Sequence, residues 1–219
     1  MSAIKKFFGK KKGNKTFKCH KKVPKGSRAY NLLLQKKDTL KSNDFAESVK
    51  LPSGTELDDW LAANIVDFYN EIIMTTEDVI KKCTPMNCPK MCAGEKYQYL
   101  WQDPNDSQYL TPTVLPAHEY ITLLYQWIDN LLEDESIFPP DPVVPFPSNF
   151  KEIASQIFRR EFRVYAHIYY SHQQDLKDLD LVAPFNTAFQ HFYAFIKEFK
   201  LVPSKELEPL HDIIVALKK

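Results

Sequence analysis

The stretch that decides the fold is FKEIASQIFRREFRVYAHIYYSH, residues 150–172. Its apolar side chains recur at helical spacing, so it predicts an amphipathic helix from about residue 150 to residue 171. Ser148 or Asn149 is expected to cap its N-terminus, and the polar run SHQQDLKD is expected to end it near Ser171. The side chains that fill the arc facing the core are Ile157, Phe158, Phe162, Val164, Tyr165, Ile168 and Tyr169.

Another face of this helix carries three arginines, Arg159, Arg160 and Arg163. They fall within about 100° of one another on a helical wheel, so they form one compact cationic face. Clustered guanidinium groups suit a phosphate, through bidentate hydrogen bonds. The alternative is that they pair with acidic side chains of the same protein. Glu161 lies at about 200°, inside the apolar arc, where an unpaired carboxylate costs several kcal/mol or stays protonated.

Two pairs of potential metal ligands, Cys83/Cys88 and His167/His172, lie far apart in the chain. Zinc favours four tetrahedral thiolate and imidazole ligands, so the two pairs together would complete one site. On a continuous helix His167 and His172 lie about 140° apart, and they can share a metal only if the helix ends or unwinds near Ser171. Such a site would join the middle of the chain to a distant helix.

The spacing alone leaves other arrangements open. Cys92 follows Cys88 by four residues, and Cys19-His20 lies near the N-terminus, so both are rival sources of ligands. The four residues can also be two unrelated pairs that bind nothing. A zinc hydrolase with Glu161 as general base requires an open coordination position and a base beside the metal. Glu161 points about 120° away from His167, and four protein ligands leave no vacancy, which argues against that chemistry.

The rest of the chain predicts a mainly α protein. Ser53 or Thr55 is expected to cap a long helix that runs to about Lys82, and CTPMNCPKMCAG (83–94) is expected to be a loop. A small hairpin is expected from KYQYLWQD (96–103) and YLTPTV (109–114). Further helices are expected near 30–42, 117–134, 184–200 and 203–217, with a proline-rich connector before residue 150.

The long helix that starts near residue 56 carries acidic residues on one side. Five residues fall within about 100° of one another on its wheel. They are Glu56, Asp59, Trp60, Ala63 and Asp67. A solvated acidic face is the common explanation of such a pattern. A tryptophan at its edge is instead typical of an interface, since exposed aromatic residues beside charge often anchor partners.

Charge is divided unevenly along the chain. Residues 1–37 hold 13 Lys/Arg and no Asp/Glu, which leaves 16 of the 29 basic residues and all 28 acidic ones in the rest. We expect residues 1–30 to be a basic, largely flexible tail and residues 31–219 to form the folded domain. Such a tail can bind nucleic acid, anionic lipid or the acidic body, or remain solvated. Neither a transmembrane segment nor a secretion signal is expected, and the four cysteines favour thiols or metal ligands.

Five segments of the sequence resemble the Mob (Mps one binder) family, in the same order, over about residues 15–217. They are LPSGTELDDWLAANIVDFYN (51–70), KYQYLWQD (96–103), FPSNF (146–150), FRVYAHIYYSH (162–172) and NTAFQHFYAFIKEFKLVPSKELEPL (186–210). Members of that family are non-catalytic co-activators of NDR/LATS-type protein kinases. The resemblance implies a Mob-type helical bundle with a small β-hairpin. It also implies one structural Zn²⁺, and the matching ligands are Cys83, Cys88, His167 and His172.

The resemblance also implies partners. It assigns Arg159, Arg160 and Arg163 to phosphothreonine peptides of upstream Ste20-like (Hippo/MST-type) kinases or scaffolds. It assigns the acidic face, Asp67 included, to the basic N-terminal regulatory region of an NDR/LATS-type kinase.

Thr16 and Thr39 match positions that Hippo-type kinases phosphorylate in animal relatives, and phosphate there should release the basic tail from the acidic face. We therefore expect an adaptor in Hippo or mitotic-exit-like signalling, without catalytic residues or a small-molecule substrate. Its expected location is the cytoplasm, with the nucleus as a second compartment. The alternative is a zinc-containing module that binds nucleic acid through the tail, although the tail lacks regular interleaving of aromatic with basic residues and a folded basic surface.

Overall fold

The structure is a computed structural model that describes residues 45–217, and for Leu217 only the backbone. Several expectations lie outside the described residues. These are the basic tail over 1–30, the helix near 30–42, the pair Cys19-His20 and the candidate phosphorylation sites Thr16 and Thr39. Within the described part of the chain, no helix combines the length and the apolar composition needed to cross a membrane.

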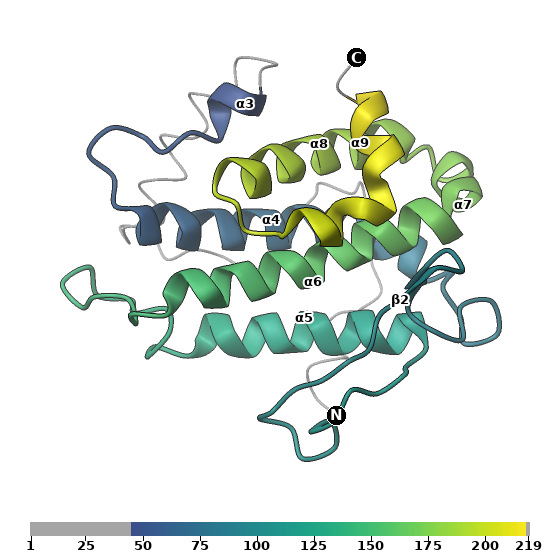
Figure 1. The fold of residues 1–219 in the computed structure, drawn as a ribbon, viewed down its shortest axis with the longest axis horizontal. Coiled ribbons are helices and arrows are strands. Elements are labelled where there is room, and N and C mark those ends of the chain that lie inside the picture. The colour runs from purple at the N-terminus through teal and green to yellow at the C-terminus, as the bar shows by residue number, and fades with distance from the viewer. Residues whose placement is uncertain (1–44, 218–219) are drawn as a thin grey trace, which may run out of the picture.

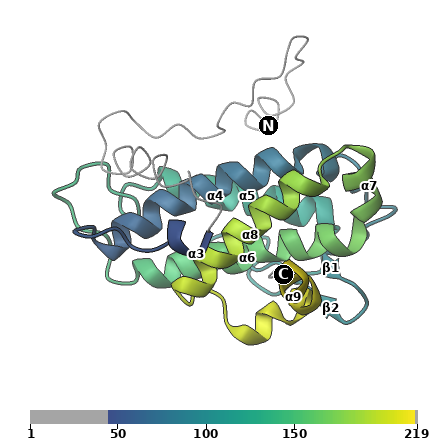
Figure 2. The ribbon, with the colours of Figure 1, turned by 90° about the horizontal axis from the view of Figure 1, so that it is seen from above.

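Four long helices form the body of the protein, as the sequence predicts. They are α4 (Leu57–Ile80), α5 (Ala117–Glu133), α6 (Phe150–Ser171) and α8 (Val182–Glu198). Helix α6 packs against both α4 and α5, and α4 also packs against α8. Figure 1 shows α5 and α6 side by side, and Figure 2 shows α8 running along the bundle when it is seen from above.

The core of this bundle is rich in aromatic side chains. The Phe68 ring of α4 lies 5.8 Å from that of Phe158 of α6, measured between ring centroids. Two rings of α8 complete the cluster, with Phe192 at 5.7 Å and Phe195 at 5.2 Å from Phe68. Burying one such ring contributes about 1.5–3 kcal/mol, so this cluster holds three helices together.

Short elements lie before, between and after the long helices. They are α3 (Phe45–Ser48), β1 (Cys92–Ala93), β2 (Tyr97–Gln98), α7 (Gln173–Asp178), the 3₁₀ helix η1 (Ser204–Leu210) and α9 (His211–Leu217). The sequence predicts neither α3 nor α7. The helix expected over 203–217 is divided into η1 and α9, because Pro209 has no N–H to donate within a regular α-helix.

The predicted boundaries of α5 and α6 are confirmed, but the predicted cap of α4 is wrong. Helix α4 begins only at Leu57, after Glu56, which makes no side-chain capping bond. Just before it the Thr55 N–H donates to the Pro52 carbonyl at 3.1 Å, and Gly54 has a φ of 76°. Ser53 and Thr55, which the sequence suggests as caps of the helix, belong instead to this turn. Gly54 occupies its third position, where a positive φ suits glycine. The residue before α6 is Asn149, as predicted, although its side chain makes no capping bond.

The hairpin forms, but with a different partner from the one expected. Strand β2 pairs antiparallel with β1, in the segment predicted to be a loop, and Ala93 lies opposite Tyr97. Gly94 turns the chain with a φ of 68°, which places the two strands side by side at once. The expected partner segment contributes a single bridge, Trp101 to Thr113. Pro112 in that segment cannot donate a backbone hydrogen bond, which shortens the pairing.

Candidate metal centre and arginine face

The two distant ligand pairs meet at one end of α6. Cys83 and Cys88 lie in the loop after α4, His167 lies in the last turns of α6, and His172 follows its end. All four side chains are buried, and their four ligand atoms lie within 4.8 Å of one another. The Sγ atom of Cys83 lies 3.4 Å from Nε2 of His167, and Sγ of Cys88 lies 3.4 Å from Nε2 of His172. The prediction that these residues converge is confirmed, and together they can hold a metal ion.

The end of α6 is what allows the two histidines to face one point. The helix ends at Ser171, and His172 leaves the helical conformation with φ −130° and ψ 25°. The centroids of the two imidazole rings then lie 5.3 Å apart. This confirms the expectation that the helix must end near Ser171, because five residues of continuous helix would turn the rings about 140° apart.

The other nitrogen of each imidazole is held by an oxygen acceptor. Nδ1 of His167 lies 2.8 Å from the backbone carbonyl of Cys92, and Nδ1 of His172 lies 2.8 Å from Oδ2 of Asp175 in α7. Each Nδ1–H therefore donates, and each Nε2 lone pair points toward the thiols. Cys92 thus contributes its carbonyl, and its thiol lies outside the cluster of four that the described residues form.

The electrostatics of the cluster suit a bound cation. Burial raises the pKa of the Cys83 thiol, which the backbone N–H of His118 at the start of α5 partly offsets by donating to it. Burial also raises the pKa of the Cys88 thiol and lowers the pKa of His167 to about 4. Buried thiols without a nearby positive charge stay protonated, whereas a divalent metal ion stabilises their thiolate forms. The neutral imidazole of His167 is already in the form that binds a metal.

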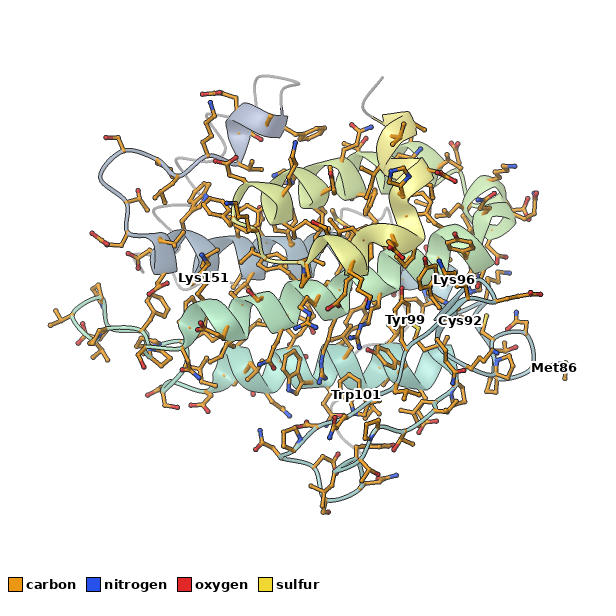
Figure 3. All side chains as sticks on the ribbon, in the orientation of Figure 1. Met86, Cys92, Lys96, Tyr99, Trp101 and Lys151 are labelled. Atoms are coloured by element: carbon orange, nitrogen blue, oxygen red, sulfur yellow. The ribbon has the colours of Figure 1, made fainter. Side chains whose placement is uncertain are left out.

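The three arginines of α6 are held by different neighbours. Arg159 forms an ion pair with Glu206 of η1, so the alternative of pairing with acidic groups is confirmed for this residue. Arg163 donates from Nη1 to the hydroxyl of Tyr120 at 2.7 Å, and its guanidinium carbon lies 5.3 Å from the centroid of the Tyr99 ring. Figure 3 shows Tyr99 and Trp101 on the segment that leads away from β2.

Arg160 lies between two tryptophans. Its guanidinium carbon is 4.4 Å from the ring centroid of Trp101 and 4.4 Å from that of Trp127, and its Nη2 donates to the carbonyl of Gln102 at 2.6 Å. Burial among these rings lowers its pKa. Each cation–π contact contributes about 0.5–2 kcal/mol, so Arg160 fastens the segment after β2 to α5 and α6.

Each of the three arginines keeps one buried N–H without a hydrogen-bond partner among the described residues. These atoms are Nε of Arg159, Nη1 of Arg160 and Nε of Arg163. Beside Arg163 lies a cavity of about 360 Å³ whose lining includes Phe162, Lys205 and Glu206. Buried donors without partners are rare in native structures, so the face retains capacity for an acceptor from outside.

Glu161 lies inside the bundle, as its position in the apolar arc predicts. It is fully buried, and neither carboxylate oxygen has a hydrogen-bond partner among the described residues. Burial, and then the charge of Glu71, raise the pKa of Glu161 well above its usual range. Its surroundings are aromatic, and the buried hydroxyl of Tyr165 one turn later also lacks a partner within the described chain. A protonated, enclosed carboxyl of this kind does not serve as the base of a zinc hydrolase.

The acidic face of α4 is less exposed than its helical wheel predicts. Glu56 is exposed and Asp67 is half-buried, but Asp59 and Ala63 are buried. The expectation of an exposed Trp60 is wrong, because only 2% of this residue is exposed and its Nε1 donates to the carbonyl of Val49 at 3.1 Å. A helical wheel cannot show this, since the covering residue belongs to the segment after α3.

Several residues beside the arginines are missed by the sequence argument. Trp101, Tyr120 and Trp127 hold the guanidinium groups, and Glu206 pairs with one of them. The only available signal is the aromatic spacing of KYQYLWQD, which predicts a strand with one aromatic face. Nothing local to η1 indicates that its acid reaches α6, 47 residues earlier in the chain.

These features define a helical bundle with a buried Cys₂His₂ centre beside a partly open cationic face. The Mob1/phocein family model matches residues 37–210. The chain is 42% identical over 210 residues to MOB kinase activator-like 1A of Arabidopsis thaliana, covering 96% of this chain and 97% of that protein. It is 45% identical over 206 residues to MOB kinase activator-like 1 homolog B of Dictyostelium discoideum, covering 94% of each. The chain therefore belongs to the Mob1/phocein family, as its motifs predict.

Proposed function

We propose that this protein is a non-catalytic adaptor and co-activator of protein kinases. The names of the relatives, which describe them as kinase activators, support this role. The observation that carries the proposal in the structure is the arginine face, where Arg159, Arg160 and Arg163 each retain a buried donor. A cationic surface whose donors are only partly satisfied is suited to binding a partner that brings further acceptors.

The metal in this proposal is one structural Zn²⁺. Zn–S bonds of about 2.3 Å and Zn–N bonds of about 2.0–2.1 Å imply sulfur–nitrogen separations of about 3.6 Å in a tetrahedral site. The 3.4 Å separations of Cys83 from His167 and of Cys88 from His172 fit such a site. Two thiolates and two imidazoles complete the coordination, so the ion stabilises the fold. It holds the end of α6 that follows the arginines.

The acceptor that best fits the arginine face is the phosphate of a phosphothreonine peptide. A phosphothreonine carries a charge of about −1.5 to −2 and three acceptor oxygens, and arginine forks bind such groups through paired hydrogen bonds. Arg163 is the best placed of the three, because it lines the cavity and uses only Nη1 within the described structure. We propose that the peptide comes from an upstream Ste20-like kinase or its scaffold.

The second proposed partner is the basic N-terminal regulatory region of an NDR/LATS-type kinase, bound at the acidic face of α4. Glu56 and Asp67 are the accessible acids of this face. Asp59, Trp60 and Ala63 can take part only if the segment that covers them moves. In this proposal phosphorylation of Thr16 and Thr39 weakens the attraction of the basic residues 1–37 to that face. The proposed location of the protein is the cytoplasm and the nucleus. Deleting residues 1–37 should then strengthen binding of the kinase peptide, and an unchanged affinity would contradict this autoinhibition.

The adaptor role is tested with purified components. The full-length protein is mixed with the N-terminal regulatory region of an NDR/LATS-type kinase, and the Kd is measured by calorimetry. Co-activation is measured as the rate at which the intact kinase phosphorylates a peptide substrate. We expect binding and a higher rate. Neither binding nor activation would refute the proposal, and tail-dependent binding to DNA in the same assay would favour the nucleic-acid alternative.

A further inference from the structure

The partner of Arg159 comes from a distant part of the chain and can be displaced. Glu206 lies in η1, and its carboxylate accepts a hydrogen bond from Nη2 of Arg159 in α6. The two side chains are 39% and 29% exposed, so water reaches the pair. Ion pairs in such surroundings are weak, and a competing anion of higher charge can replace one partner.

The same carboxylate belongs to the lining of the cavity beside the arginines. Glu206 lines this space of about 360 Å³ together with Arg163 and Lys205. Glu206 therefore pairs with Arg159 and lines the same cavity as Arg163. Nε of each of these arginines has no hydrogen-bond partner among the described residues. The carboxylate of Glu206 thus provides an acceptor for only some of the N–H groups of the arginine face.

We propose that Glu206 is a resident carboxylate that competes with any incoming anion and so sets a threshold of affinity that a phosphothreonine passes and a peptide carboxylate does not. This inference rests on the proposed phosphopeptide binding. A peptide carboxylate brings one negative charge, the same charge as Glu206, and gains little by replacing it. A phosphate brings a charge of about −1.5 to −2 and a third acceptor oxygen, so it can displace Glu206 from Arg159 and still present oxygens to the cavity that Arg163 lines.

Glu208 provides a matched control two residues later in the same 3₁₀ helix. It lines the same cavity and carries the same charge. Its carboxylate accepts a hydrogen bond from the Tyr97 hydroxyl at 3.1 Å and lies 3.9 Å from Nζ of Lys96. None of its contacts in the described structure is with an arginine of α6. Glu208→Gln therefore removes the same charge without removing the competitor.

The test measures binding of a fluorescein-labelled peptide library with a fixed central phosphothreonine, and of a second library with glutamate at that position. Fluorescence anisotropy gives the Kd for the full-length wild type, Glu206→Gln, Glu208→Gln and Arg163→Ala. We expect Glu206→Gln to bind the phosphorylated library about two- to fivefold more tightly, because the resident ion pair is lost. The glutamate library should gain by a similar factor, because both anions displace the same carboxylate. Glu208→Gln should shift both libraries much less than Glu206→Gln does.

The outcomes separate this inference from the proposed function. If wild type binds the phosphorylated library, Arg163→Ala does not, and Glu206→Gln equals wild type, the competitor role of Glu206 is wrong and the phosphopeptide site stands. Equal effects of Glu206→Gln and Glu208→Gln also overturn it, because they show only a general effect of charge. If no variant binds the phosphorylated library, both proposals are wrong. Melting curves of each variant confirm that the comparison is made between folded proteins.

Discussion

Polar atoms at the end of α6 have partners, whereas several polar atoms in its middle have none in the described structure. At the end, His167 and His172 each have both ring nitrogens engaged, one by an oxygen acceptor and one toward a cysteine thiol. In the middle, Arg159, Glu161 and Arg163 each keep a buried atom without a partner in the described structure. The complete set suits a fixed centre that holds the fold. The incomplete sets mark either a binding surface, where the side chain reaches the surface, or a cost in stability, where the acceptor is enclosed.

The largest expected effect comes from removing one ligand of the metal centre. Cys83→Ser should abolish stoichiometric metal binding and lower the melting temperature by about 10 °C or more, because a structural zinc contributes directly to the folding free energy. Metal content is measured by mass spectrometry and unfolding by circular dichroism. Cys92→Ser is the matched control, since this residue contributes its carbonyl, and it should retain the metal. Normal metal content in Cys83→Ser would show that the cluster is not the binding site.

The second-largest expected effect concerns the buried carboxyl of Glu161. Glu161→Leu should raise the unfolding free energy by about 1–3 kcal/mol, which corresponds to roughly 3–8 °C in melting temperature, because it removes a buried carboxyl without a partner. Glu161→Gln keeps the shape and the polarity, so its gain should be smaller. Differential scanning calorimetry measures both. An unchanged or lower melting temperature for Glu161→Leu would show that Glu161 is satisfied where it is.

The third effect separates two arginines that a helical wheel treats alike. Arg160→Ala should lower the unfolding free energy by about 1–2 kcal/mol, because its guanidinium packs between Trp101 and Trp127. Arg163→Ala should cost less stability and should abolish phosphopeptide binding. Urea denaturation and peptide titration measure the two properties. Equal losses of stability in both variants would mean that the tryptophan contacts contribute little.

The smallest expected effect is a change of the unfolding free energy with pH. The folded-state pKa of Glu161 is raised, so its contribution to stability is complete below the unfolded value of about 4.3 and is lost as pH rises through the folded-state pKa. Wild type should therefore lose about 1 kcal/mol per pH unit relative to Glu161→Gln above about pH 4.3, where the unfolded carboxyl is ionised and the folded one is still protonated. Urea unfolding at a series of pH values measures the difference. Parallel curves would show that folding does not raise the pKa of Glu161.

Local periodicity was sufficient to predict the ends of α6 and the residues on its buried face. The spacing of apolar residues predicts both ends of the helix and places Glu161 among them, because these properties depend on neighbours three and four residues away. The approach of the two ligand pairs is predicted by the family resemblance and not by periodicity, and spacing alone leaves Cys92 as a rival. The structure removes that ambiguity by directing the Cys92 carbonyl to His167.

Where the prediction failed, the deciding feature lies outside the element whose pattern was used. Trp60 is buried because Val49 accepts its N–H, and β2 pairs with β1 because Gly94 turns the chain early. A wheel or an alternation pattern describes one element and contains no information about what covers it.

The sequence by itself determined the helices, the ligand pairs, the cationic face and the awkward carboxyl of Glu161, because periodicity and residue chemistry are local properties. Only the tertiary structure decided which arginine is stacked between tryptophans, which one is paired with Glu206, and which one borders a cavity. The physical reason is that a long, flexible guanidinium group takes its hydrogen bonds and ring contacts from whatever the fold brings near it. On this helix those neighbours come from α5, η1 and the segment after β2.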